Sequence, residues 1–408
     1  MVTKRVLRVV AVVLLSFLAI PLFGVVKGSD SSVSVESNYT FPSVDTDNKI
    51  LGFGWFKNGF SLEDAATTCT FDSVYPVSGT VDLNGGTIYL NQDLIFKNIT
   101  TLSGAGSVLG NGHIIELCES IESFPANTDT FENTHIFLAT DLTLNSTITF
   151  KGNCSVHGNG NLLFLGDSGA LVVDSDSHLE LQGLEIEEIK GENIQCVDDT
   201  ASITLADVRM IQGADYSFKS GSIAFHGLVS WLGAYTLNYD SAFTSTINNN
   251  TTLHITDGLH FCIGRDQQTG SEPLVFEDAT SVLRLDSCTF IISGSGATLS
   301  KGTIALDKDI DVEVVSTTTS NGLILGDGSE GGDITINVSP SAIVNLRNGY
   351  LVFNNVDSSK FISTSHSARI ARHLDSLVYF AQDTVLNEVS LELVSNLIAH
   401  LEVADGNV

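Results

Sequence analysis

Short stretches of alternating apolar and polar residues fill most of this chain, and Gly, Asn or Asp separates one stretch from the next. Residues 178–184 are typical, with leucines at 179 and 181 between polar neighbours. A period of two indicates a β-strand with one buried face. The spacing of an amphipathic helix is almost absent before Ser365. The pattern therefore predicts an all-β body made of many short strands.

The chain also repeats itself at a fixed interval. Residues 90–112 align without a gap on residues 138–160, and both copies end in Ser-Val-x-Gly-Asn-Gly. Residues 172–184 align on residues 196–208, 24 positions further on, so the first interval of 48 is twice the second. A strand-based repeat of this length fits one coil of a β-solenoid. We therefore expect a parallel β-helix with coils of about 24 residues.

Stacked coils place constraints on both the strands and the corners between them. Inward side chains such as Phe261, Phe290 and Phe353 are expected to stack as apolar ladders from coil to coil. Corners accept insertions and need Gly or Asn where the backbone takes a positive φ. We therefore expect the coil length to vary, and the variation to fall at the corners.

The chain divides into four predicted parts. Residues 1–28 form a signal or anchor, residues 29–78 an N-terminal cap or linker, and residues 79–360 the solenoid. Residues 361–408 are expected to form a C-terminal cap. There, helix-compatible spacing between residues 368 and 378 predicts a short helix or irregular turn, and the alternation from Val389 predicts terminal strands.

The first residues have the pattern of a secretory signal. Lys4, Arg5 and Arg8 precede an apolar stretch from Val9 to Phe23, and small or β-branched residues favour cleavage after Gly28. An uncleaved membrane anchor is the alternative, because Val25 and Val26 lengthen the apolar run. We expect a secreted, cell-surface or periplasmic protein whose membrane contact is limited to this segment.

Charge and cysteine content narrow the possible partners and compartments. The formal net charge is −29, which disfavours nucleic acid as a partner because phosphate binding needs a basic face. The six cysteines are an even number and permit disulfides in an exported protein, but no C-x-x-C pair indicates a zinc or redox site. Since most of them lie in strand-like runs, we expect at least four to be buried thiols.

The Gly-x-Gly-x-Val-x-Gly-Asn-Gly turn at residues 104–112, together with the coil pattern, resembles the pectin-lyase-like superfamily over residues 80–355. The resemblance implies a right-handed parallel β-helix. Members of that superfamily include polysaccharide lyases, glycosidases, phage tailspikes and bacterial surface adhesins. No catalytic residue is carried over, because Gly-His-Gly, Arg-Ile-Lys and Arg-x-Pro motifs do not occur in this sequence.

Three carboxylates are the candidates for a catalytic role if the protein is an enzyme. Asp174 precedes Asp198 by one repeat, and Asp199 follows directly. In register, Asp174 and Asp198 would stack roughly 4.8 Å apart, where they would act as a general acid and base or bind Ca²⁺. The alternative, which we favour, is that all three are turn residues, because Asp caps turns through its own side chain. No cofactor is otherwise indicated.

Two functions are compatible with these features. The leading hypothesis is an exported, non-enzymatic surface protein with an adhesive or structural role, which contacts an extracellular glycan or protein ligand. The competing hypothesis is a carbohydrate-active enzyme, a polysaccharide hydrolase or lyase, acting in a groove of the β-helix. A fold of this kind hosts unrelated functions, so the fold alone does not decide between them.

Overall fold

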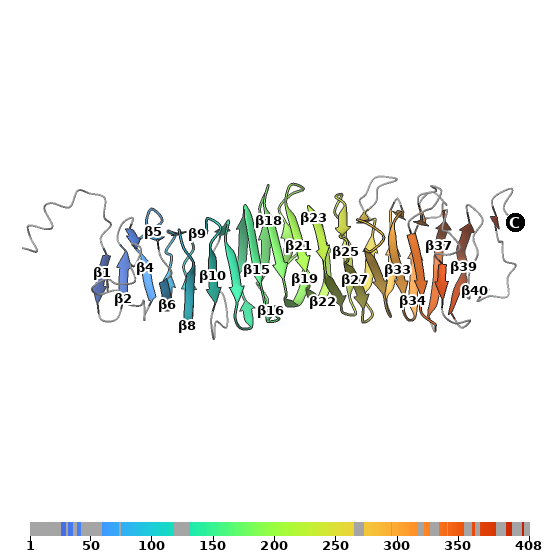
Figure 1. Ribbon diagram of the computed structural model, residues 1–408, viewed down its shortest axis with the longest axis horizontal. Coiled ribbons are helices and arrows are strands. Elements are labelled where there is room, and N and C mark those ends of the chain that lie inside the picture. The colour runs from blue at the N-terminus through green and yellow to red at the C-terminus, as the bar shows by residue number, and fades with distance from the viewer. Residues whose placement is uncertain are drawn as a thin grey trace, which may run out of the picture. The chain divides into compact units, whose positions relative to one another are not determined.

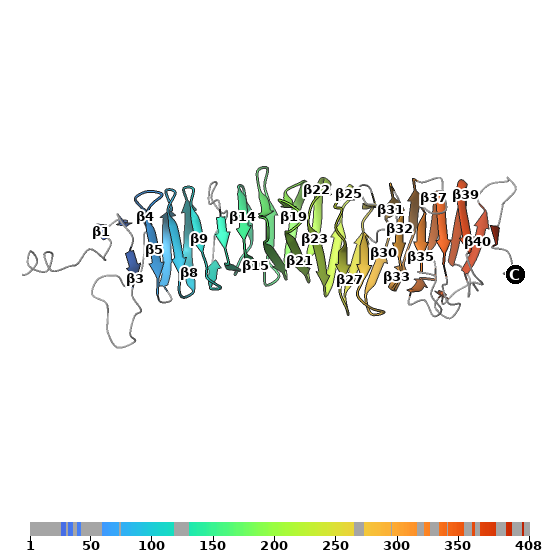
Figure 2. The ribbon, with the colours of Figure 1, turned by 90° about the horizontal axis from the view of Figure 1, so that it is seen from above.

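The fold is that of a computed structural model (Figure 1, Figure 2). It describes residues 26–29, 32–35, 39–41, 59–72, 75–117, 130–264, 273–294, 296–315, 322–326, 334–340, 342–354, 361–363, 368–380, 389–393 and 402–403. The chain divides into two compact units, Met1–Thr140 and Asp141–Val408. Every regular element among the described residues is a strand.

In the first unit, the chain alternates between two sheets. One sheet holds β1 (Val26–Ser29), β2 (Ser32–Val35), β4 (Gly59–Leu62), β6 (Tyr75–Asp82), β8 (Leu94–Ser103), β10 (Ile114–Leu117) and β12 (His135–Leu138). The other holds β3 (Tyr39–Phe41), β5 (Thr68–Phe71), β7 (Thr87–Leu90), β9 (Ser107–Leu109) and β11 (Thr130–Glu132). Neighbouring strands pair in parallel, as β7 and β9 do, whereas β1 pairs antiparallel with β2.

In the second unit, the coils build three sheets. The first holds β15 (Asn153–His157), β18 (His178–Gln182), β21 (Ser202–Ala206), β23 (Ser222–His226), β26 (Ser245–Ile247) and β29 (Leu274–Phe276), and the second holds β14 (Thr147–Lys151), β17 (Ala170–Val173) and β20 (Ile194–Cys196).

The third sheet of this unit is the longest and continues to the last described strand. It holds β13 (Leu142–Leu144), β16 (Leu162–Leu165), β19 (Glu185–Gly191), β22 (Arg209–Phe218), β24 (Leu228–Leu232), β25 (Thr236–Tyr239), β27 (Thr252–Thr256), β28 (His260–Ile263), β30 (Val282–Leu285), β31 (Thr289–Ile292), β32 (Ala297–Leu299), β33 (Gly302–Leu306), β34 (Ile310–Val314), β35 (Leu323–Leu325), β36 (Ile334–Val338), β37 (Ile343–Phe353), β38 (Phe361–Ser363), β39 (Ala368–Phe380), β40 (Val389–Leu393) and β41 (Glu402–Val403).

The pairing register confirms the predicted all-β parallel β-solenoid. Leu181 of β18 pairs with Leu205 of β21, one coil further along the chain. Successive coils lie about 23 residues apart. The coil is longer where Ile304 of β33 pairs with Ile336 of β36. The extra length falls between the strands, as expected when corners take up the insertions.

The longer of the two intervals seen in the sequence does not correspond to two complete coils. Leu90 ends β7 and Leu138 ends β12, and these strands belong to different sheets. The self-similarity reflects a corner sequence that recurs on more than one face of the coil. Any corner that joins two strands through an Asn-Gly pair makes the same demand on its residues, so the match repeats without marking a full turn.

Apolar ladders fill the interior, as predicted. The rings of Phe261 and Phe290, paired residues of β28 and β31, stack with their centroids 5.6 Å apart. Phe218 and Tyr239 stack in the same way, also at 5.6 Å. Phe353 is fully buried among neighbouring strands. Offset stacks of this kind add to the burial of apolar area, so each coil stabilises the next.

The described part of the C-terminal region corrects one prediction. The short helix or irregular turn expected between residues 368 and 378 is wrong, because β39 runs through them and pairs with β37. Residue spacing compatible with a helix is overridden by the open edge of β37, which offers a ladder of backbone partners. The terminal strand expected from Val389 is confirmed as β40. Parallel pairing also includes β4 and β5, which lie in the predicted N-terminal cap, and β39 and β40, which lie in the predicted C-terminal cap. The limits of the two caps stay predictions.

The cysteines that the structure describes are buried, as expected for most of them. They are Cys69, Cys154, Cys196, Cys262 and Cys288, and all five are thiols. Cys118 lies outside the described residues. Burial raises the pKa of Cys196 and of Cys288 to about 12, and it raises the pKa of Cys69 well above its usual value. A thiol that does not ionise is a poor nucleophile, so these side chains act as small apolar residues.

The predicted positive φ at the corners is present. Asn84-Gly85, Asn111-Gly112 and Asn159-Gly160 have φ pairs of 47° and 86°, 50° and 80°, and 52° and 84°. Two successive left-handed residues reverse the chain within a tight turn, which is the geometry that Asn-Gly favours. The turn sequence therefore sets where one strand of a coil ends and the next begins.

We expect Gly160→Ala to lower the free energy of unfolding by about 1–2 kcal/mol, because a Cβ is strained in the left-handed region. The new Cβ would meet no atom within 4 Å, so the loss isolates the backbone term. Gly160→Asn is the matched control and should lose less, because Asn tolerates this φ. Urea titrations of the three proteins test this, and equal losses for the Ala and Asn variants would contradict it.

Iodoacetamide at about pH 8 should leave Cys69, Cys196 and Cys288 unmodified in the folded protein, because the reactive thiolate is suppressed. The same cysteines should be alkylated in concentrated guanidinium chloride. Peptide mass spectrometry of both samples measures the difference. Alkylation of Cys196 at similar rates in both conditions would refute the burial argument.

Candidate functional site

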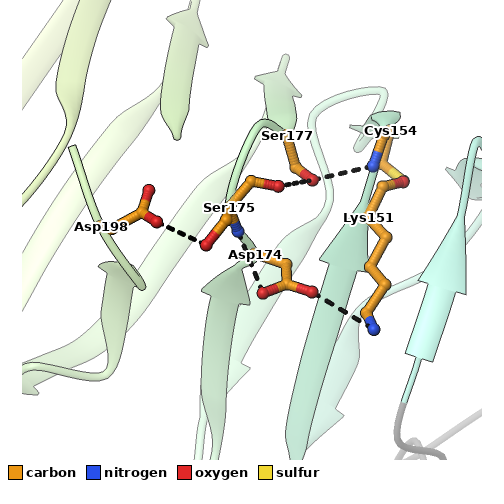
Figure 3. Close-up of polar contacts among 7 residues, drawn as sticks. Lys151, Cys154, Asp174, Ser175, Ser177 and Asp198 are labelled. Carbon is orange, nitrogen blue, oxygen red and sulfur yellow. Dashed lines mark hydrogen bonds and ion pairs between the residues drawn. The ribbon is translucent and has the colours of Figure 1, made fainter. Parts of the chain in front are cut away.

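The three candidate carboxylates lie at one corner of neighbouring coils. Asp174 follows β17, and Asp198 and Asp199 follow β20. The carboxylate of Asp174 lies 3.2 Å from the Lys151 ammonium, whereas the carboxylate of Asp198 faces the Ser175 hydroxyl (Figure 3). Asp199 is exposed. The corner therefore directs Asp174 and Asp198 toward different partners.

The expected one-coil stacking of Asp174 on Asp198 is wrong by one residue. Val173 pairs with Cys196, so the coil is shorter at this corner than the predicted repeat. Ser175 thereby faces Asp198, and its Oγ donates a hydrogen bond to Asp198 Oδ2. The sequence alignment placed Val197 on Val173 because both are valines. In the structure, Cys196 takes the inward position opposite Val173, and Val197 is exposed.

Asp198 is held by a network of donors within the corner. It accepts hydrogen bonds from the Thr200 amide at 2.9 Å and from the Thr200 hydroxyl at 2.6 Å. The Thr200 hydroxyl in turn accepts one from the Asp176 amide of the preceding coil at 2.7 Å. The hydrogen bonds from Ser175 and Thr200 lower the pKa of Asp198. An Asp held in this way caps the turn and joins two coils.

The same arrangement recurs at another corner of this unit. Asp278 accepts hydrogen bonds from the Thr280 amide at 2.7 Å and from the Thr280 hydroxyl at 2.6 Å, and these bonds lower the pKa of Asp278. The Thr280 hydroxyl accepts one from the Asn250 amide at 2.7 Å, and Asn250 and Asp176 have the same φ of 53°. We call both arrangements Asp-x-Thr corners. Because the device appears twice, it favours a structural role for Asp198.

A second feature of this unit is a polar groove of about 730 Å³ over the starts of β28, β31, β34, β37 and β39. Successive strands contribute one residue each to its central row, and of these only Ala371 is buried. That row consists of His260, Thr289, Asp311, Asn345 and Ala371, which pair in register. Neighbouring strands in a sheet lie roughly 4.8 Å apart, so the side chains of this row form an ordered line.

The hollow arises from a contrast in side-chain size. Gly258, Ser287 and Ala371 line it with small side chains, while His260 and Arg347 are among its larger lining residues. Asp309, just before β34, is also exposed in the lining. The groove thus combines small and apolar lining residues with charged groups of both signs.

A β-bulge places Arg347 in this groove. Leu346 pairs with Val312 while Asn348 pairs with Glu313, so Arg347 is the extra residue of β37. Its Nη2 lies 3.0 Å from Asp311 Oδ1, and its Nη1 lies 3.2 Å from His373 Nε2. Asn345 Nδ2 donates to the same Asp311 oxygen at 2.9 Å. Bulges often redirect a side chain next to a functional site.

Sequence reasoning missed this groove. Its residues are spread between positions 258 and 373, and the members of its central row follow one another at unequal intervals along the chain. Arg347 and His373 show no motif in the sequence. The sequence signal that could have helped is the alternation within each strand. It marks which residues point outward, but it does not show which strands become neighbours.

The described residues contain no group of three or more His, Cys, Asp or Glu side chains that could hold a metal ion. In the same part of the chain, no helix is long and apolar enough to cross a membrane. The chain matches no known family model, no curated protein and no solved structure.

Asp198→Asn and Asp278→Asn should destabilise the protein to similar extents, because each weakens the same Asp-x-Thr corner. A lowered folded-state pKa means that the stabilisation is present above the unfolded carboxyl pKa of about 3.9 and is lost as pH falls through the lower folded value. Urea titrations between about pH 2 and pH 6 should therefore show a smaller loss on acidification in each variant than in the wild type. An unchanged pH profile in both variants would contradict the capping role.

Proposed function

We propose that this protein is an exported β-solenoid of the pectin-lyase-like kind that acts at the cell surface in an adhesive or structural role. The observation that carries the proposal is the continuity of the parallel ladders, which repeat outward polar positions from coil to coil. A repeat surface of this kind within each unit suits contact with an extended ligand. The partner class is an extracellular glycan or protein.

The secretory pattern and the charge support the same proposal. Residues 1–25 lie outside the described residues, and the signal with cleavage after Gly28 remains a prediction from sequence. A net charge of −29 favours a solvated surface and disfavours nucleic acid as a partner. We therefore propose a secreted, cell-surface or periplasmic location.

A carbohydrate-active enzyme is the second candidate. One observation favours it: the polar groove brings Asp309, Asp311 and His260 into one lining. Carboxylates in a groove are the groups that glycoside hydrolysis requires. Asp311 is already bonded to Asn345 and Arg347, which weighs against its acting as a general acid.

The adhesive proposal predicts that the Asp198→Asn/Asp199→Asn double variant keeps its binding within about twofold, because the corner caps a turn. Binding of the full chain to a printed array of neutral and acidic polysaccharides and to poly-lysine-coated and gelatin-coated surfaces measures this at neutral pH. Asp278→Asn is the matched control, because it alters an equivalent corner.

Release of reducing ends from the same polysaccharides is measured in parallel. Cleavage that is abolished by Asp311→Asn or by Asp198→Asn but retained by Asp278→Asn would overturn the adhesive proposal and support the enzyme. Absence of binding to every surface by the wild-type chain would count against adhesion as well.

A further inference from the structure

The polar groove gathers cationic and titratable groups in a chain that is otherwise strongly acidic. Its ionisable lining residues are His260, Cys288, Asp309, Asp311, Arg347 and His373. Cys288 stays neutral, because burial raises its pKa to about 12. Two carboxylates and one guanidinium give the lining a formal charge of −1 when both histidines are neutral, and of +1 when both are protonated. Protonation of both histidines would therefore reverse the formal charge of the lining.

The contact between Arg347 and His373 requires a neutral imidazole. Arginine is only a donor, so His373 Nε2 must accept the hydrogen bond from Arg347 Nη1, 3.2 Å away. Protonation places a hydrogen on Nε2 and leaves two cations facing each other. The contact is then lost, which frees the Arg347 Nη1 donor, and the His373 ring gains an N–H donor at Nε2.

The described charged groups near His373 lie on β34, β37 and β39. His373 contacts Arg347, and Asp311 accepts from Asn345 and from Arg347. Glu313, which pairs with Asn348 next to Arg347, is a further half-buried carboxylate on β34. Arg372, beside His373 in β39, donates through its Nε to the Ser376 carbonyl.

His260, at the other end of the row, lies beside Thr289 and Cys288 on one side and pairs with Thr236 on the other. The Thr236 amide there donates to Asp215. Asp257, Asp309 and Tyr235 are exposed titratable groups near this end. Protonated His260 thus adds a second cation to the lining.

We propose that this groove is a pH-gated binding site for an oxyanion of the sulfate or phosphate type, which it holds under mildly acidic conditions and releases near neutral pH. The planar guanidinium offers paired donors that match such oxygens, and two imidazolium groups add charge-assisted hydrogen bonds. A hollow of about 730 Å³ leaves room for the anion and for a group attached to it. The inference does not rest on the proposed adhesive function.

Inorganic sulfate is the probe, because its charge is constant across the pH range. Calorimetric titration of the full chain with sodium sulfate, at constant ionic strength set with sodium chloride, should give at least tenfold tighter binding at about pH 5.5 than at about pH 7.5. His373→Gln should remove most of this gain, because the glutamine oxygen accepts from Arg347 at either pH, and the His260→Gln/His373→Gln double variant should abolish it. His226→Gln is the matched control, since His226 is an exposed histidine outside the groove, and it should keep the gain.

Circular dichroism and the thermal midpoint confirm that each variant is folded. A second variant, Arg347→Gln, should weaken sulfate binding at both pH values. Equal affinity of the wild type at the two pH values, or full retention of the pH dependence by the His260→Gln/His373→Gln double variant, would overturn the proposal. Adhesion is measured separately at neutral pH, so failure here and failure of the adhesive proposal are distinguishable.

Dextran sulfate in the same titration separates the two sources of the anion. Tighter binding per sulfate group than the free ion, still lost in His373→Gln, indicates an ester carried on a surface polymer. Equal affinity per group indicates the free ion. Binding of the polymer that does not depend on His373 or on pH would argue against the site.

Discussion

Registration of each coil on the next is the constraint on which the structure depends. In a parallel ladder, every strand uses its backbone donors and acceptors on both neighbours, so a shift of one residue turns inward side chains outward. The pairing of Leu179 with Ile203 and of Leu181 with Leu205 keeps four leucine or isoleucine side chains inside. Corners can vary in length because the paired strands between them fix the register.

The Asp-x-Thr corners show how the register is kept where the ladder is interrupted. At each corner the backbone leaves the sheet, and its amides need other acceptors. Thr200 and Thr280 supply an acceptor to the preceding coil, and Asp198 and Asp278 orient those hydroxyls. Polar side chains at a corner thus replace the backbone partners that the sheet provides elsewhere. This accounts for acidic residues at positions that a catalytic interpretation would also select.

The fold followed from the sequence because the alternation within strands and the recurring coil length are local signals. Asn-Gly corners, inward phenylalanines and buried thiols could be predicted for the same reason, since each depends on a few neighbouring residues. The relation between Asp174 and Asp198 could not, because a single residue gained or lost at a corner changes which residues face each other. The groove was harder to predict from the sequence, because several corners of unequal length determine that His260, Asp311 and Arg347 share one lining. For residues 368–378 the local signal was misleading. Their spacing is compatible with a helix, but pairing with the open edge of β37 made them a strand.

The extra residue in β37 shows how a β-solenoid can accept an insertion in its sequence. Insertion of one residue at Arg347 alters the outward face of two neighbouring strands, while pairing resumes at Asn348. Each coil contacts only its neighbours, so the disturbance stays local. New surface chemistry can therefore be acquired one coil at a time, by lengthening or shortening a single strand or corner, without a redesign of the interior that all coils share.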